Sequence, residues 1–176
     1  MNPPFTWFGG FRYFNLGEKL DISSQRTVAG AFEQGSYNIR TTNNLYGAQL
    51  GARMRQTQGR FEWEATGKAG VYGNDADQAQ TVTDFPPGGP APFQLRNASS
   101  GQSGVAFIGE GNLTGRYRLT NVWNIRAGCN VIWIEGLALA PDQLDFNLAA
   151  AQGGRRLDND GGLFLHGVNV GLEARW

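Results

Sequence analysis

The stretch GLFLHGVNVGLEARW, residues 162–176, decides how the rest of the sequence is interpreted. From Phe164 to Trp176 every second residue is apolar or aromatic except His166. The positions between them are mostly small, polar or charged, and include Glu173 and Arg175. Alternation with a period of two is typical of a β-strand with two unlike faces. Soluble strands and membrane strands both show this pattern, so further features must reveal which face meets water.

The same alternation recurs along the chain, whereas helical periodicity is hard to find. The sequence therefore predicts an all-β fold with about six long strands. They fall at about residues 6–22, 42–55, 60–74, 104–120, 123–133 and 162–176.

The connections between these segments alternate in length. Two are tight, namely QTQG before Arg60 and LTN before Val122. Three are long, at about residues 23–41, 75–103 and 139–160. Outer-membrane barrels combine short periplasmic turns with long external loops. The pattern thus predicts an antiparallel up-and-down meander of a transmembrane β-barrel.

Composition excludes several other classes. Fifteen basic residues balance fifteen acidic ones, which argues against nucleic acid as a partner. The single Cys129 cannot form an internal disulfide, and no apolar run is long enough for a transmembrane helix. The N-terminus MNPPFTWFGG lacks the pattern of a secretory signal. A chain of 176 residues is expected to form one domain, residues 1–176.

No catalytic, metal or cofactor site is predicted. His166 shares its strand face with apolar residues and has no Ser or Asp partner on the same wall, so we expect an interfacial residue and no enzyme. The acidic stretches at 73–77 and 157–162 lack the Glu that would complete a calcium loop, which makes them turns.

Residue size indicates that lipid covers the apolar face. That face is rich in Gly and Ala, which would pack a small soluble core poorly. Trp123 and Trp133 lie ten residues apart on one face, about 25 Å of membrane depth for a tilted strand. Aromatic residues also gather at the tight-turn ends of the strands, as membrane-interface residues do. The predicted interface set is Phe61, Trp63, Tyr117, Trp123, Trp133 and Trp176.

With lipid outside, the charged residues face the lumen. They would form either a mixed-charge pore lining that biases which solutes pass, or a salt-bridged plug in a narrow barrel. The predicted pore-lining residues are Arg53, Arg55, Glu62, Glu64, Lys68, Glu110, Arg116, Arg118, Arg126, Glu173 and Arg175.

Several blocks, among them GGFRYFNLGEKLDI at 9–22, FEWEATGKAGVYGND at 61–75 and the final GLFLHGVNVGLEARW, resemble β-barrel porin family 7, a bacterial outer-membrane family. The resemblance covers nearly the whole chain from Phe8 onward. It implies no catalytic residues, because the family has none to carry over. It also implies that this chain is the C-terminal part of a larger barrel, since family members are longer before the GFRY block.

The expected function is a porin-like passive channel for small polar solutes in the bacterial outer membrane. The alternatives are a structural or surface-display barrel with a closed lumen whose long loops bind partners, and a soluble β-barrel that binds a hydrophobic ligand. Expected partners are outer-membrane lipid and, through the C-terminal strand, the barrel-assembly machinery.

Six strands are too few for a closed bacterial barrel. Missing N-terminal strands or a second chain are therefore expected to complete the wall. The strands at 6–22 and 162–176 should then be unpaired edges of an open, curved sheet.

Overall fold

The computed structural model describes residues 5–28, 30–85, 93–147 and 153–174. Within these ranges the protein is all-β, as predicted, with a single 3-10 turn, η1 (Pro141–Gln143), and no helix long and apolar enough to cross a membrane. The strands are β1 (Phe5–Val28), β2 (Ala31–Gln58), β3 (Phe61–Phe85), β4 (Phe93–Arg118), β5 (Trp123–Leu137) and β6 (Gly161–Ala174).

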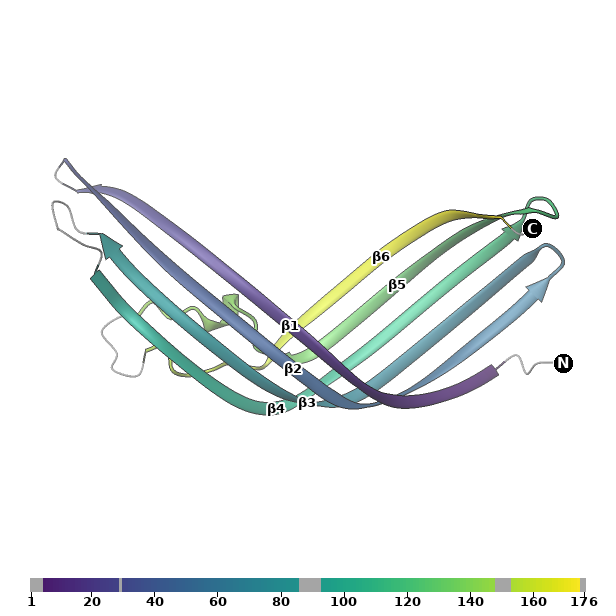
Figure 1. Cartoon of the computed structure of the whole chain (residues 1–176), viewed down its shortest axis with the longest axis horizontal. Coiled ribbons are helices and arrows are strands. Elements are labelled where there is room, and N and C mark those ends of the chain that lie inside the picture. Colours follow the sequence, from purple (N-terminus) through teal and green to yellow (C-terminus); the bar gives the residue numbers. More distant parts are fainter. Residues whose placement is uncertain (1–4, 29, 86–92, 148–152, 175–176) are drawn as a thin grey trace.

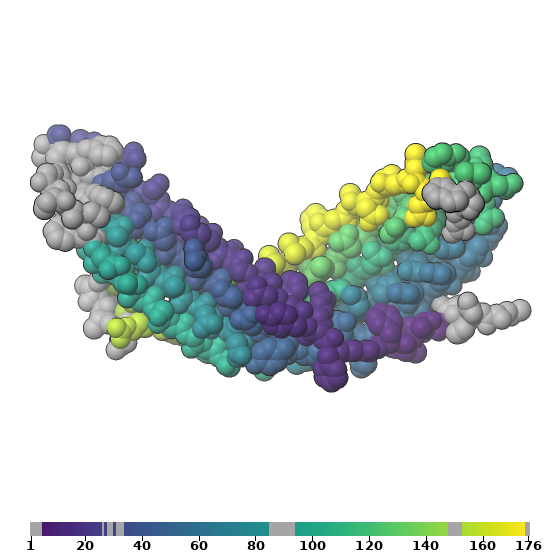
Figure 2. Space-filling view, viewed as in Figure 1, coloured from purple at the N-terminus to yellow at the C-terminus, as the bar shows by residue number. Residues whose placement is uncertain are grey.

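The six strands form one antiparallel sheet in sequence order, so the predicted meander is confirmed. The sheet curves into a half-barrel whose strands bend near their middle (Figure 1). Strands β5 and β6 occupy only one arm of this bend. Within the described residues, β1 and β6 do not pair with each other, so they are the two edges of the curved sheet. Figure 2 shows β1 in purple and β6 in yellow. We call the concave side of the sheet the trough. The open sheet expected from the strand count is therefore observed.

Both tight turns are confirmed. Gly59 adopts φ 62°, the left-handed conformation that glycine accepts without strain, and thereby closes the β2–β3 hairpin. In the β4–β5 turn the hydroxyl oxygen of Thr120 accepts hydrogen bonds from the backbone N–H groups of Val122, at 3.2 Å, and Trp123, at 2.9 Å. Each turn thus has a local chemical cause.

Two of the three long connections are in fact mostly strand, which corrects the prediction for residues 23–41 and 75–103. Pairing of β1 with β2 continues to Val28 opposite Ala31. Pairing of β3 with β4 continues to Asp84 opposite Phe93, and residues 86–92 lie outside the described ranges. Polar residues occupy much of both faces there, so the alternation that marks a strand is weak. Of the predicted connection 139–160, the described residues 139–147 and 153–160 are irregular, as predicted, apart from η1.

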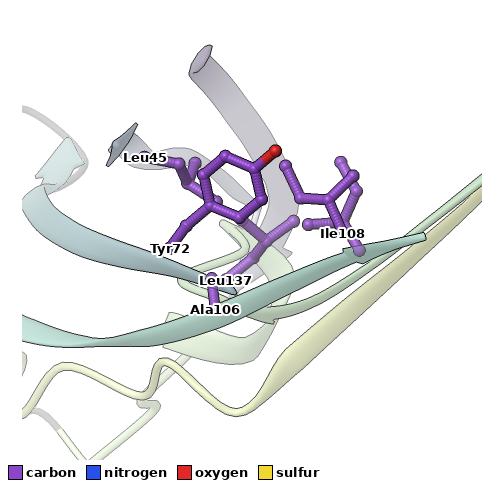
Figure 3. Close-up of a cluster of buried hydrophobic side chains, with 6 residues drawn as sticks. Leu45, Tyr72, Ala106, Ile108 and Leu137 are labelled. Carbon is purple, nitrogen blue, oxygen red and sulfur yellow. The ribbon is translucent and has the colours of Figure 1, made fainter. Parts of the chain in front are cut away.

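The row of paired residues Tyr13, Tyr46, Gly73 and Val105 divides the sheet into two halves. We call the part between this row and the tight turns the near half, and the part beyond it the far half. At the junction, a buried apolar cluster lies on the inner face (Figure 3). It contains Leu45, Tyr72, Ala106, Ile108, Ile134 and Leu137.

A glycine makes room for the largest member of this cluster. A Cβ atom on Gly70 would lie 2.7 Å from the carbonyl oxygen of Ala48 and 2.8 Å from the Tyr72 ring. Because these distances are shorter than real contacts, only glycine allows the sheet to curve this tightly beneath the ring.

Candidate functional site

The outer face of the near half is apolar and open. Phe11 is 93% exposed and Val168 is 85% exposed. The residues that alternate with them along the same strands point to the inner face and include charged and polar ones. A soluble protein places its apolar residues the other way round. Such a surface is suited to contact with lipid hydrocarbon. The largest exposed apolar residues on this face include Trp7, Phe11, Leu50, Val71, Val105, Val168, Val170 and Leu172.

The predicted interface aromatics border this apolar band. Phe61 and Tyr117 face each other across β3 and β4 beside the tight turns, and Trp63 lies one outward position further in. Trp123 begins β5 at the same end. Trp133 lies toward the bend, with its ring centroid 6.1 Å from that of Phe107. Trp176 lies outside the described residues.

A second row of aromatic residues closes the band at the bend. The Tyr13 hydroxyl donates a hydrogen bond of 2.8 Å to Asn44, and the Tyr46 hydroxyl donates one of 2.9 Å to Asp75. On β2, Gln58, which lies opposite Phe61, is twelve positions beyond Tyr46. At roughly 3.3 Å per residue and a tilt near 40°, the band is about 30 Å high. This height is close to the hydrocarbon thickness of a bilayer.

Ten of the eleven predicted lumen residues lie on one inner face, and Arg175 lies outside the described residues. Lys68 and Arg12 both form ion pairs with Glu110. The guanidinium of Arg116 donates a hydrogen bond of 2.8 Å to Glu62. We call the charged residues on this inner face of the near half the charge ladder. The further pairs are Arg53 and Arg55 with Glu64, and Arg116 and Arg126 with Glu173.

Sequence reasoning did not include Arg12 in this ladder. Its strand, β1, carries aromatic residues on both faces, so its orientation was ambiguous. The shared parity of Arg12 and Glu18 was the available signal, and both residues lie on the inner face. Arg12 on β1 reaches Glu110 on β4, which shows how strongly the sheet curves across the two strands between them.

In the far half, the chain after β5 returns along the inner face. We call its described residues, 138–147 and 153–160, the inner segment. Asn43 accepts a hydrogen bond of 2.8 Å from the backbone N–H of Ala138 and donates one of 2.9 Å to its carbonyl oxygen. Asn74 donates one of 2.9 Å to the carbonyl oxygen of Gly136, just before the segment. Amide side chains thus hold a backbone as a neighbouring strand would.

Glutamine side chains continue this row of contacts. Gln78 donates a hydrogen bond of 2.7 Å to the carbonyl oxygen of Arg156, and Gln80 donates one of 2.8 Å to that of Gln143. Within the segment, Gln143 donates to the Asp158 carbonyl at 2.6 Å and accepts from its N–H at 2.9 Å. The two parts of the inner segment are therefore joined to the wall and to each other.

A buried arginine holds the end of the first part. Arg96 donates hydrogen bonds to the carbonyl oxygens of Asp145, at 2.7 Å, and Asn147, at 2.8 Å. The Tyr37 hydroxyl accepts a hydrogen bond of 3.0 Å from the Asp145 N–H. The backbone N–H groups of Asn147 and Gly154, together with nearby Arg96, lower the pKa of the Asp145 carboxyl. The polar network therefore favours a charged Asp145.

The remaining sequence candidates form no reactive arrangement in the described part of the chain. His166 lies on the outer face, with its ring centroid 5.9 Å from that of Phe164, so its predicted strand face is correct. Its strand position is opposite Val131, inside the apolar band. No three metal-ligating side chains gather within the described ranges.

Comparison with known proteins identifies the family. No curated protein and no solved structure matches this chain. A family model does match, over residues 3–176, in agreement with the resemblance seen in the sequence. The chain therefore belongs to the family described as Putative beta barrel porin-7.

Proposed function

We propose that the protein is part of an outer-membrane barrel that acts as a porin-like passive channel for small polar solutes. The observation that carries this proposal is the reversed polarity of the near half, with exposed apolar residues outside and the charge ladder inside. The family name supports a porin, and it points to a non-enzymatic barrel. Outer-membrane lipid is then the partner of the outer face.

Two measurements test the channel. The protein refolded in detergent should show a β-rich far-UV spectrum and heat-modifiable migration on gels. After incorporation into planar bilayers, it should give discrete conductance steps in potassium chloride. A folded, membrane-inserted barrel with no conductance above background would contradict a passive channel.

We also propose that further strands complete the wall. The open edges of β1 and β6 would leave unpaired backbone groups in lipid, each costing several kcal/mol. Strands preceding β1 are our first choice, and a second copy of the chain is the alternative. Native mass spectrometry in detergent separates them, because a 19.2 kDa chain paired with itself would be detected at twice its mass.

The edge strand β6 is our proposed contact with the barrel-assembly machinery. It presents an apolar row from Phe164 to Leu172, interrupted only by His166, beside a free backbone edge. Replacing Val170 with Asp should slow assembly in reconstituted outer-membrane vesicles that contain the machinery. The same substitution should slow spontaneous insertion into detergent much less, and equal slowing in both would contradict the proposal.

A closed-lumen, surface-display barrel is the second candidate. It is favoured by the apolar cluster at the bend and by the inner segment, which both cover parts of the inner face. Conductance separates the two functions. A closed barrel should conduct only after the inner segment is released from the wall, for example by Arg96→Ala combined with Tyr37→Phe.

A further inference from the structure

The charge ladder holds more basic than acidic residues. On the described inner face of the near half we count seven basic side chains and four carboxylates. The chain as a whole is electrically balanced, so this excess is local. The basic residues are Arg12, Arg53, Arg55, Lys68, Arg116, Arg118 and Arg126, and the acidic ones are Glu62, Glu64, Glu110 and Glu173.

The exposed parts of the ladder are more positive than the count alone implies. The side chains of Arg53 and Arg55 are 50% and 54% exposed, whereas their shared partner Glu64 is 21% exposed. Arg126 is 41% exposed and its partner Glu173 is 31% exposed. In six of the seven ion pairs of the ladder the basic side chain is the more exposed one, and in the pair of Arg116 with Glu173 the two side chains are about equally exposed. Solvent in the trough therefore meets mainly guanidinium groups.

Two arginines of the ladder are close neighbours of like charge. Arg116 and Arg126 stand directly opposite each other on β4 and β5. They share the carboxylate of Glu173, and Arg116 also binds Glu62. The Nε atoms of both are buried and form no hydrogen bond with any described residue. The available carboxylates thus leave donor capacity of these guanidinium groups unused.

We infer that the near half of the lumen selects small anions over cations, with the arginines of the charge ladder as the selecting residues. The inference rests on the proposed channel function. A surplus of one sign of charge, set between low-dielectric walls, concentrates counter-ions of the opposite sign. Chloride, phosphate and small carboxylates share the chemistry that guanidinium groups bind.

Reversal potentials across a potassium chloride gradient test the inference. The protein in planar bilayers should admit chloride at least about threefold better than potassium. Arg53→Gln combined with Arg55→Gln should bring this ratio close to one. Glu62→Gln should raise it. A higher salt concentration should weaken the preference, because it screens the exposed guanidinium groups.

Arg40→Gln provides the matched control. Arg40 is exposed on the outer face of the far half, opposite Lys19 and Ala79 on the neighbouring strands. Arg40→Gln therefore removes one positive charge, as Arg126→Gln does, without touching the lumen. Its selectivity should equal that of the original protein. A cation-selective or unselective channel would overturn the inference, as would an equal effect of Arg40→Gln and Arg126→Gln.

A binding measurement separates this inference from the channel function. In detergent, an anionic fluorescent dye should bind more tightly than a cationic dye of the same size. The Arg53→Gln and Arg55→Gln double variant should weaken binding of the anionic dye at least about threefold. Preferential binding of the anionic dye without conductance would contradict only the proposed channel function. Conductance without anion preference in either assay would contradict only the inferred anion selectivity.

Discussion

Strands β2 and β3 build the inner face of the trough twice, in two different ways. In the near half their inner side chains are charged, pair with each other and border open space. In the far half they include amides that bind the backbone of the inner segment, alongside buried apolar side chains such as Ile39 and Val82. The outer face changes at the same row of tyrosines, from apolar to polar. The same two-residue alternation of a strand can therefore exist in an apolar and in a polar environment. The condition is that each inward polar side chain finds a partner, which is another charged side chain in the near half and a backbone group in the far half.

The largest effect is expected at the junction between the halves. Tyr72 is buried there, and its hydroxyl donates a hydrogen bond of 3.2 Å to Gln49. Tyr72→Ala should lower the free energy of unfolding by about 3–5 kcal/mol, because it opens a cavity in the apolar cluster. Urea unfolding in lipid vesicles measures this loss. A loss below about 1 kcal/mol would mean that the halves are not joined through this cluster.

A new charge should lower the free energy of unfolding on the outer face of the near half but not on that of the far half. Val168→Arg places a guanidinium inside the apolar band and should cost about 2–4 kcal/mol. Asn97→Arg makes the same kind of change on the exposed outer face of the far half and should cost close to nothing. The two variants are compared in the same urea experiment. Equal costs would refute the boundary at the tyrosine row.

Substitution of two arginines in the far half compares a buried side chain that binds the inner segment with an exposed side chain that does not. Arg96→Ala leaves the carbonyl oxygens of Asp145 and Asn147 without their donor and should destabilise the inner segment by about 1–3 kcal/mol. Arg156→Ala removes an exposed side chain and keeps the backbone contact with Gln78, so it should have almost no effect. Trypsin cleavage after Arg155, a site present in both variants, reports release of the segment. The prediction fails if Arg156→Ala speeds this cleavage as much as Arg96→Ala does.

The smallest expected effect is a pH dependence confined to the inner segment. Hydrogen bonds from the Asn147 and Gly154 amides, and the charge of Arg96, lower the pKa of Asp145 in the folded state. Its stabilisation is therefore complete above the ordinary carboxyl pKa and is lost as the pH falls through the lower folded value, below about pH 4. Hydrogen exchange of these two amides, corrected for intrinsic rates, should show less protection there. Asp145→Asn should remove this pH dependence, and an unchanged profile in that variant would disprove the role of the carboxylate.

The sequence alone predicts a strand and the direction of its side chains where one face of the strand is chemically unlike the other. That condition holds in the near half, so the meander, the tight turns and the inward direction of Arg53 and Glu62 could be predicted. It fails in the far half, where residues such as Gln78 and Gln80 look like loop residues. Their burial depends on backbone groups 63 to 78 positions away. Contacts of that kind leave no local pattern, which is why the extended strands and the returning segment were missed.

The length of the far half has a practical consequence for detecting the protein with an antibody. From Tyr46 back to Ala31, β2 continues for about 50 Å of strand at roughly 3.3 Å per residue. If the apolar band lies in the bilayer, the β1–β2 hairpin lifts Gly30 well clear of the lipid head groups. An epitope inserted at Gly30 would thus stand well away from the membrane surface, where an antibody can reach it on protein embedded in lipid vesicles.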